Sequence, residues 1–344
     1  MFGLSRLSRH LPFGRKPMGP TAYYTHPECL EHDMGEGHPE CPERLIAIER
    51  RIKDSPLAAH LRRHESPEVD LADVARAHEQ GYVANLRDFM QQIMASGKTR
   101  AIEPDTWVCP GSWQAALRAA GAAVAATDAV LDGQAANAFC AVRPPGHHAT
   151  RREAMGFCFF NNVAVAVRHA LDVRGLKRVA VVDFDLHHGN GTEDILAGDD
   201  RVLMVGLFEE GAYPFTGAPP MADNMLNLPV PPRTPPAEIR DMIQAQWLPR
   251  LNAFKPQMIF ISAGFDAHRE DPLGGLGFSE DDYEWITRRI VEVAMRHCHG
   301  RVVSCLEGGY NLSALARSVE SHLKVLCEAS GPVRAPAALR AAHR

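Results

Sequence analysis

Short apolar runs alternate with longer amphipathic stretches through most of the chain. The runs are rich in Val, Ile, Met and Phe and lack strict polar–apolar alternation, which is typical of strands buried on both faces of a sheet. They predict strands at Ala138–Val142, Arg178–Asp183, Arg201–Leu207, Gln257–Ser262 and Arg301–Leu306.

Between and around these runs, apolar residues recur at helical spacing. The pattern predicts helices at Pro42–Asp54, Gly111–Leu131, Asn161–Val173, Pro236–Phe254, Ser279–His299 and Ser313–Glu328. Strands that alternate with helices in this way form a mostly parallel sheet covered by helices on both faces. The fold class is therefore α/β, in one domain.

The two ends of the chain differ from this pattern. Residues 1–20 contain four Lys and Arg and no acidic residues, with three prolines and three glycines, and we expect a flexible extension there. Residues 330–344 have the character of a flexible tail. The expected catalytic domain spans residues 21–329.

Composition excludes several classes of protein. The net charge of −5, from 37 Lys and Arg against 42 Asp and Glu, argues against a nucleic-acid-binding protein. No apolar run approaches the roughly 18–20 residues of a membrane span. The eight cysteines are scattered without a CxxC pair, which favours reduced thiols in a cytoplasmic protein. A homo-oligomer is compatible with the sequence.

Polar, glycine-rich segments follow four of the predicted strands. They are RPPGHH after Val142, DFDLHHGNGT from Asp183, AGFDAH after Ser262 and EGGY after Leu306. Because ligands of parallel sheets bind beyond the carboxyl ends of the strands, these segments predict one common site.

The segment from Asp183 to His187 alternates polar and apolar residues, so its three polar side chains face one side. Two carboxylates and an imidazole crowded at a strand end favour a divalent cation between them. Asp185 and His187 are candidate ligands, and Asp266 in GFDAH is a third. One nitrogen and two oxygens suit zinc, with Fe(II), Co(II) or Mn(II) as alternatives. A hydrogen-bonded polar strand end without metal is the competing interpretation.

Two further segments carry candidate catalytic groups. His147 and His148 follow a Pro-Pro-Gly turn and could divide proton transfer and charge stabilisation, with Asp183 and Asn190 orienting their rings. Tyr310 ends a GGY turn and could donate a hydrogen bond to an oxyanion, although such a turn is often only structural. In GFCFFNN (156–162), the aromatic residues could line a channel or belong to the core.

The segment HDMGEGHPECPERL contains His32, Asp33 and His38 at spacings that would suit a second metal. An ordinary loop before the helix that starts near Pro42 is the favoured interpretation.

Five motifs together resemble those of the zinc-dependent histone deacetylase and acetylpolyamine amidohydrolase superfamily. They are RPPGHHA, GFCFFNN, DFDLHHGNGTED, AGFDAHREDPLGG and LEGGYNL. HDMGEGHPECPERL is similar to the entry motif of its class II-like branch. The resemblance runs from about Tyr23 to Val325, and it implies the arginase/deacetylase fold with a central sheet of about eight strands.

The resemblance also implies roles for individual residues. Zinc ligands fall on Asp185, His187 and Asp266. His148 matches the general base, with Asn190 behind it, and His147 matches its electrostatic partner, with Asp183 behind it. Tyr310 matches the tyrosine that stabilises the transition state.

Positions around the substrate are implied in the same way. Phe157 and Tyr213 resemble tunnel walls, and Asp105, Leu273 and Gly308 lie at rim or tunnel positions. A potassium ion would bind the backbone oxygens of Asp183, Asp185, His187 and Leu207. This chain has Gly206 where the family usually supplies a serine hydroxyl to that ion, which weakens the expectation.

The implied function is zinc-dependent hydrolysis of the amide of acetyl- or acyl-lysine in proteins or peptides. Zn²⁺ is the expected cofactor, with Fe²⁺ or Co²⁺ as alternatives and K⁺ as a further ion. An acetylpolyamine amidohydrolase is the alternative, and Leu273, at the place of a glutamate gatekeeper in polyamine-selective relatives, favours acyl-lysine. An arginase-like dimetal enzyme would need a carboxylate where His268 stands. A catalytically silent acyl-lysine binder would not need His147, His148 and Tyr310.

Overall fold

The structure, a computed structural model, describes residues 19–331, so residues 1–18 of the expected extension and 332–344 of the expected tail lie outside the described residues. Gly19 and Pro20 are buried, which places the start of the packed chain before the expected boundary. The backbone N–H of Gly331 donates to the carbonyl of Gly19 at 2.8 Å, so the two ends of the described chain meet.

Eight strands form one sheet in the order β2-β1-β5-β10-β9-β6-β7-β8, and every neighbouring pair is parallel. The strands are β1 (Thr21–Thr25), β2 (Leu61–Glu65), β5 (Asn137–Cys140), β6 (Val179–Asp183), β7 (Val202–Glu209), β8 (Met225–Val230), β9 (Met258–Ala263) and β10 (Val302–Leu306). A separate two-stranded pair is made of β3 (Arg100–Ala101) and β4 (Trp107–Val108). The predicted α/β fold with a central sheet of about eight strands is confirmed.

All five predicted strands are present, as β5, β6, β7, β9 and β10. Every residue of β6, β9 and β10 is buried, as expected for strands covered on both faces. The sequence pattern missed β1, β2 and β8.

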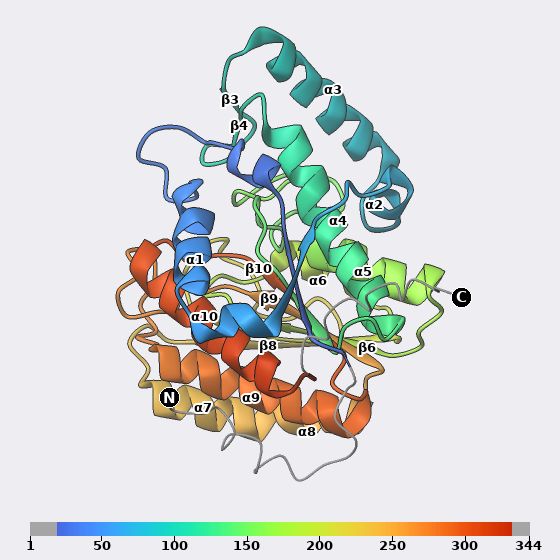
Figure 1. The fold of residues 1–344 in the computed structure, drawn as a ribbon, viewed down its shortest axis with the longest axis vertical. Coiled ribbons are helices and arrows are strands. Elements are labelled where there is room, and N and C mark those ends of the chain that lie inside the picture. The colour runs from blue at the N-terminus through green and yellow to red at the C-terminus, as the bar shows by residue number, and fades with distance from the viewer. Residues whose placement is uncertain (1–18, 332–344) are drawn as a thin grey trace, which may run out of the picture.

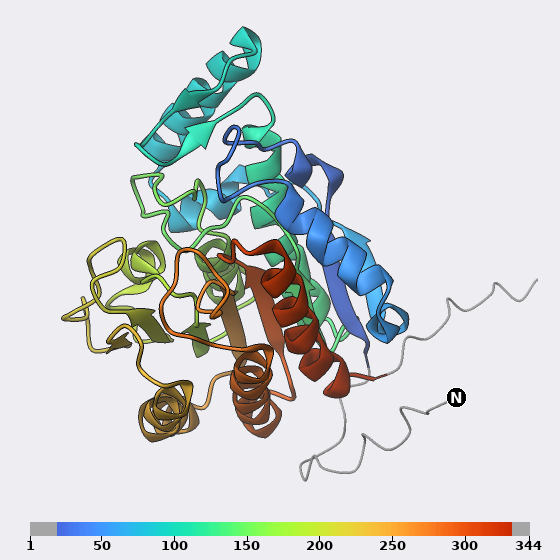
Figure 2. The ribbon, with the colours of Figure 1, turned by 90° about the vertical axis from the view of Figure 1, so that its left-hand side faces the viewer.

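Helices cover both faces of the sheet (Figure 1). They are α1 (Glu43–Lys53), α2 (Leu71–Ala77), α3 (Gln80–Ser96), α4 (Ser112–Leu131), α5 (Asn162–Arg168), α6 (Asn190–Leu196), α7 (Pro236–Met242), α8 (Leu248–Phe254), α9 (Glu280–His297) and α10 (Leu312–Glu328). Helix α10 packs between α1 and α9, whereas α4 packs against α5. Helix α3, which the sequence pattern missed, projects away from the sheet in both views (Figures 1 and 2).

The predicted helices agree with the structure apart from local interruptions. The stretch predicted at Asn161–Val173 is α5 followed by a π-helical turn at His169–Val173, and that predicted at Pro236–Phe254 contains a π-helical turn at Ile243–Trp247 between α7 and α8. Among the described helices, none is both long and apolar enough to cross a membrane.

Candidate functional site

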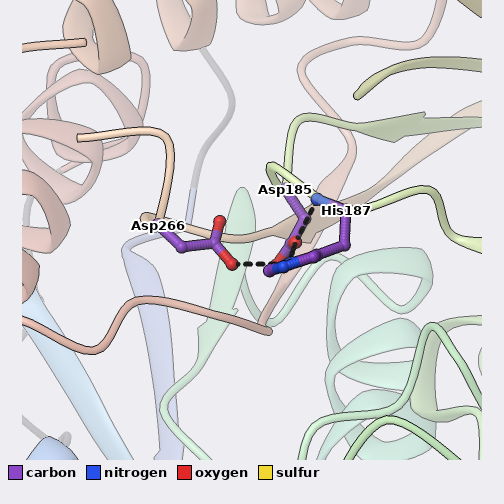
Figure 3. Close-up of side chains that lie close together, drawn as sticks. All are labelled: Asp185, His187 and Asp266. Atoms are coloured by element: carbon purple, nitrogen blue, oxygen red, sulfur yellow. Dashed lines mark hydrogen bonds and ion pairs between the residues drawn. The ribbon is translucent and has the colours of Figure 1, made fainter. Parts of the chain in front are cut away.

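Three side chains converge at the carboxyl ends of two adjacent strands, β6 and β9. Asp185 and His187 follow β6, and Asp266 follows β9; one ligand atom of each lies within 4.8 Å of the others. His187 Nδ1 lies 3.1 Å from Asp185 Oδ1 and 3.0 Å from Asp266 Oδ2 (Figure 3). The predicted ligand set is therefore brought together.

Backbone N–H groups orient both carboxylates. Asp185 accepts hydrogen bonds from the N–H groups of His187 at 2.8 Å and Gly308 at 2.8 Å, and Asp266 accepts one from Leu186 at 2.9 Å. Since Gly308 follows β10, a third strand end also holds the cluster.

The charges of the cluster fit a cation. Both carboxylates are fully buried. Burial and the neighbouring carboxylate Asp185 raise the pKa of Asp266 to about 6. Burial opposes ionisation of Asp185 too, but His147 and His187 hold its pKa below the usual range. A buried set of two carboxylate oxygens and one imidazole nitrogen is a donor set that Zn²⁺, Fe²⁺ or Co²⁺ accepts, and such an ion would remove the repulsion between the carboxylates.

Gly308 lies beneath the candidate ligands rather than at a rim. A Cβ atom at this position would lie 2.2 Å from Asp266 Oδ2 and 2.6 Å from Asp185 Oδ2. Only glycine can therefore bring the end of β10 so close to both carboxylates.

The two predicted histidines stand beside this cluster, with ring centroids 4.0 Å apart. Nδ1 of His147 lies 3.1 Å from Asp183 Oδ2, and Nδ1 of His148 lies 2.7 Å from Asn190 Oδ1. A hydrogen bond from Nδ1–H to the amide oxygen of Asn190 leaves Nε2 of His148 free to accept a proton.

The environments of the two rings push their pKa values apart. Burial disfavours the charge of His147, but Asp185 and Asp183 raise its pKa to about 10. Burial and the neighbouring His147 and His187 lower the pKa of His148 well below its usual value. Groups of this kind can serve as a charged partner and a neutral base.

Tyr310 ends a turn that several groups hold. Its backbone N–H donates to Asp271 Oδ2 at 2.6 Å, and its ring lies 5.1 Å from the guanidinium carbon of Arg44. Glu307, which starts the turn, accepts hydrogen bonds from the N–H groups of Gly146 at 2.7 Å and His147 at 3.1 Å. The tyrosine and histidine segments are thus joined directly.

Residues that surround this centre include those predicted as walls and rim. Tyr213 packs edge-on against His148, with centroids 5.1 Å apart, and Phe157 packs edge-on against Tyr310 at 6.0 Å. The carbonyl of Asp105 lies 3.1 Å from Nε2 of His38, whose ring also packs edge-on against Phe157 at 4.8 Å. Leu273 is half-exposed, and its N–H donates to Asp271.

Asp183 of the predicted potassium site is the register partner of Gly206, the residue that stands in place of the family's serine. A Cβ atom at Gly206 would lie 3.7 Å from the carbonyl oxygen of Asp183 and meet nothing closer than 3.6 Å, so a larger side chain has room there. The potassium site itself, which also includes Asp185, His187 and Leu207, stays a prediction.

The second metal considered at His32 and His38 gains no support. Within residues 19–331, Asp185, His187 and Asp266 are the one group whose ligand atoms could hold an ion together. Nδ1 of His32 instead lies 2.8 Å from Ser112 Oγ.

The eight cysteines form no disulfide bonds and six of them are buried, as the sequence led us to expect.

Besides Glu307, four buried charged residues around the catalytic segments were not predicted as site residues. They are Glu40, Arg44, Arg143 and Asp271. The first three lie inside the motifs HPECPER and RPPGHH, and the signal that could have revealed them is the presence of ionic residues next to segments predicted to be buried.

The chain is similar to known proteins of one family. The histone deacetylase domain family matches residues 38–326. A probable deacetylase of Archaeoglobus fulgidus is 37% identical over 85% of this chain and 82% of its own length. A histone deacetylase-like amidohydrolase of Pseudomonas aeruginosa is 36% identical over 80% of this chain and 73% of its own. The crystal structure of the HDA15 HD domain superposes with a TM-score of 0.83 at 32% identity, covering 91% of this chain and 90% of that one.

Proposed function

The chain belongs to the histone deacetylase family and is a hydrolytic deacetylase, and from that premise we propose that it cleaves the amide of acyl-lysine side chains in proteins or peptides with one bound zinc ion. The observation that carries the proposal is the convergence of Asp185, His187 and Asp266 beside His148 at one edge of the sheet. The ligands fit the ion because two buried carboxylates there need a positive charge.

Zinc held by these three residues would supply a Lewis acid toward the amide carbonyl and would lower the pKa of a water molecule. Nε2 of His148 takes the proton of that water as its oxygen forms a bond to the carbonyl carbon. The hydroxyl of Tyr310 donates a hydrogen bond to the oxyanion that develops. When the carbon–nitrogen bond breaks, His148 returns the proton to the departing amine, which leaves a carboxylic acid and a free amine.

The second histidine has an electrostatic task in this scheme. His147, whose Nδ1 lies 3.1 Å from Asp183 Oδ2, would offset the negative charge that develops on the reacting carbonyl oxygen. Phe157 and Tyr213 would exclude water from the reacting atoms, with Asp105 and Leu273 at the entrance.

An acetylated polyamine is the second candidate substrate. Leu273 is half-exposed and apolar, so it offers no charge to a cationic polyamine, and this supports acyl-lysine as the main substrate. An arginase-like reaction is disfavoured because Nδ1 of His268 accepts the N–H of Glu270 and its Nε2 faces Glu280 at 3.6 Å.

The test compares kcat/KM on acetyl-lysine peptides and acetylated polyamines, with the bound metal counted per chain. We expect one zinc per chain and a preference for the peptides. A polyamine preference above about tenfold, or roughly 1.4 kcal/mol, would reverse the order of substrates. Two manganese ions per chain would instead support the arginase-like reaction.

Single substitutions test the assigned roles. Tyr310→Phe and His148→Ala should each lower kcat by about 100-fold or more while the bound zinc stays at one per chain. Tyr24→Phe, on β1, is the matched control and should leave kcat within about twofold, since its hydroxyl bonds only to the carbonyl of Ala125. An unchanged kcat in Tyr310→Phe or His148→Ala would refute the assignment, and peptide binding without turnover in the unmodified protein would identify a silent binder.

A further inference from the structure

A buried ion triad lies behind the candidate active site. Glu40, Arg44 and Arg143 are each fully buried. Glu40 Oε1 accepts from Arg44 Nη1 at 3.0 Å, and Glu40 Oε2 accepts from Arg143 Nη2 at 2.7 Å. Nε of Arg143 also donates to Glu40 Oε1. One carboxylate therefore bridges two guanidinium groups.

The first arm of the triad holds the turn that carries Tyr310. Arg44 Nε donates to the carbonyl of Gly309 at 2.7 Å, and its Nη2 donates to the carbonyl of Glu307. Its guanidinium carbon lies 5.1 Å from the centroid of the Tyr310 ring. Arg44 thus touches the residues on either side of Gly308 and the tyrosine itself.

The second arm reaches the segment that carries the histidines. Arg143 directly precedes the turn that leads to His147 and His148. Its Nη1 donates to the carbonyls of Cys29 and His32, at 2.9 Å each, so its guanidinium is fixed independently of Glu40. The carboxylate of Glu40 consequently connects Arg44, which holds the Tyr310 turn, to the fixed guanidinium of Arg143, which precedes the two histidines.

A general stabilising role is a poor explanation for this arrangement. Removing ionic groups from water costs several kcal/mol each, and well-packed apolar residues often replace a buried ion triad without loss of stability. Bidentate contacts to a guanidinium do, however, fix relative position and direction. The triad therefore supplies a fixed geometry that an apolar cluster would not supply.

We propose that Glu40 is a positioning residue that sets the place of the Tyr310 hydroxyl relative to His148 through Arg44 and Arg143. The inference rests on the proposed function, because it concerns how the same reacting groups are held. It predicts a loss in the chemical step with substrate binding and metal binding intact.

The test is Glu40→Gln, which keeps the size and one acceptor oxygen but removes the charge. We expect kcat to fall between about 10- and 100-fold with KM within about twofold, since small displacements of reacting groups have effects of this size. Zinc content should stay at one per chain. The matched control is Glu49→Gln on α1, where the carboxylate pairs with Arg63 at 2.6 Å and leaves the active site untouched; its kcat and KM should stay within about twofold.

A double-mutant cycle separates positioning from general damage. In the Tyr310→Phe background there is no hydroxyl left to place, so Glu40→Gln should lower kcat by less than about threefold more. The proposal would be overturned if the kcat of the double variant fell by the full product of the two single losses. An unchanged kcat in Glu40→Gln, or a change confined to its KM, would also overturn it. If Glu40→Gln does not fold, Glu40→Asp, which retains the charge on a shorter side chain, enters the same cycle. An unchanged kcat in Tyr310→Phe alone would refute the proposed function instead.

Discussion

Each carboxylate of the candidate metal centre is held by a backbone N–H group from a strand end. Asp185 is held by His187 and Gly308, and Asp266 by Leu186. Backbone donors cannot rotate away as side chains can, so the ligand oxygens stay in place without depending on a metal to gather them. The chain thereby provides a preformed set of donors.

These residues could be predicted from the sequence because their chemistry is concentrated at strand ends. Asp185, His187 and Asp266 each follow an apolar run, and the rule that parallel strands end at one edge brings them together. Glu40 was missed because it follows no predicted strand, and Asp271 was missed because it lies farther from the strand end at Ser262 than Asp266 does. Their importance depends on the partners that tertiary folding supplies, such as Arg143 and the N–H of Tyr310.

Substitution of Gly308 tests how closely the third strand end approaches the ligands. Gly308→Ala places a Cβ atom 2.2 Å from Asp266 Oδ2, closer than any relaxed contact, so the carboxylate must move. We expect bound zinc to fall below about one tenth of an equivalent per chain, measured by metal analysis after dialysis, because ligand geometry decides metal affinity.

The control for this effect is Gly206→Ala, inside β7. The new Cβ would have 3.6 Å to its nearest neighbour, so zinc content and kcat should match those of the unmodified protein. Zinc retained at one per chain in Gly308→Ala would mean that the strand end yields more easily than the structure indicates.

At the scale of elements, the interior strands of the sheet other than β1 were predictable, whereas its two edge strands were not. Strands β6, β9 and β10 are covered on both faces, so they appear as uninterrupted apolar runs. Strand β2 is an edge strand with the sequence LRRHE, and β8, at the other edge, contains Pro229. Edge strands tolerate charges and proline because one side of their backbone lacks a partner strand, and this removes the apolar signal.

The segment that carries Tyr213 is fastened to the sheet by buried polar groups. Glu193 on α6 lies 2.8 Å from Nε2 of His188, and its other oxygen accepts from the N–H of Met221 at 2.8 Å and from the amide of Asn227 at 3.1 Å. His188, which the sequence left without a role, therefore belongs to an anchor that holds the segment from Tyr213 to Met221.

Removal of this anchor should loosen the wall that faces His148. Glu193→Ala removes the acceptor of the Met221 N–H and one acceptor of the Asn227 amide, which also donates to the carbonyl of Gly217 at 2.9 Å. Each lost hydrogen bond should cost about 1 kcal/mol. We expect faster proteolysis within residues 211–221 and a rise of about fivefold or more in KM for a peptide substrate, because a mobile wall must be ordered on binding.

Glu193→Gln serves as the rescue, since its amide oxygen can accept the same two hydrogen bonds. Its KM and its cleavage pattern should stay close to those of the unmodified protein. The anchor would have no effect on the active site if Glu193→Ala also kept its original KM.

At the scale of the whole molecule, several histidines outside the site are buried as neutral rings. His78 Nε2 accepts the N–H of Asn161 at 2.9 Å, so it can carry no proton, and its Nδ1 donates to the carbonyl of Thr150 at 2.8 Å. Nδ1 of His322 lies 2.7 Å from Thr287 Oγ1, and its Nε2 lies 2.9 Å from Oγ of Ser304 on β10. These rings are satisfied core histidines.

The buried rings make the fold sensitive to mild acid. Burial lowers the pKa of His322 to about 3, and burial, with the nearby Arg151, lowers that of His78 to about 4. Below pH 6.5 these two histidines bind protons in the unfolded chain but not in the folded chain. Their contribution to the stability of the fold is therefore complete above pH 6.5, and it is lost as the pH falls toward their pKa values in the folded chain. At pH 5 each ring should lower the free energy of unfolding by about 2 kcal/mol, which is a large share of the total of about 5–15 kcal/mol that is typical of proteins.

His322→Gln tests this contribution, because glutamine can hydrogen-bond to both hydroxyls but does not titrate. We expect the loss in free energy of unfolding between pH 7 and pH 5, measured by urea denaturation of the metal-free protein, to be smaller by about 2 kcal/mol than in the unmodified chain. His299→Asn, at an exposed position with φ of 57°, is the control and should leave the loss unchanged. Equal losses in His322→Gln and the unmodified chain would show that His322 takes up no excess protons on unfolding, and the acid sensitivity would then have to arise at other buried groups.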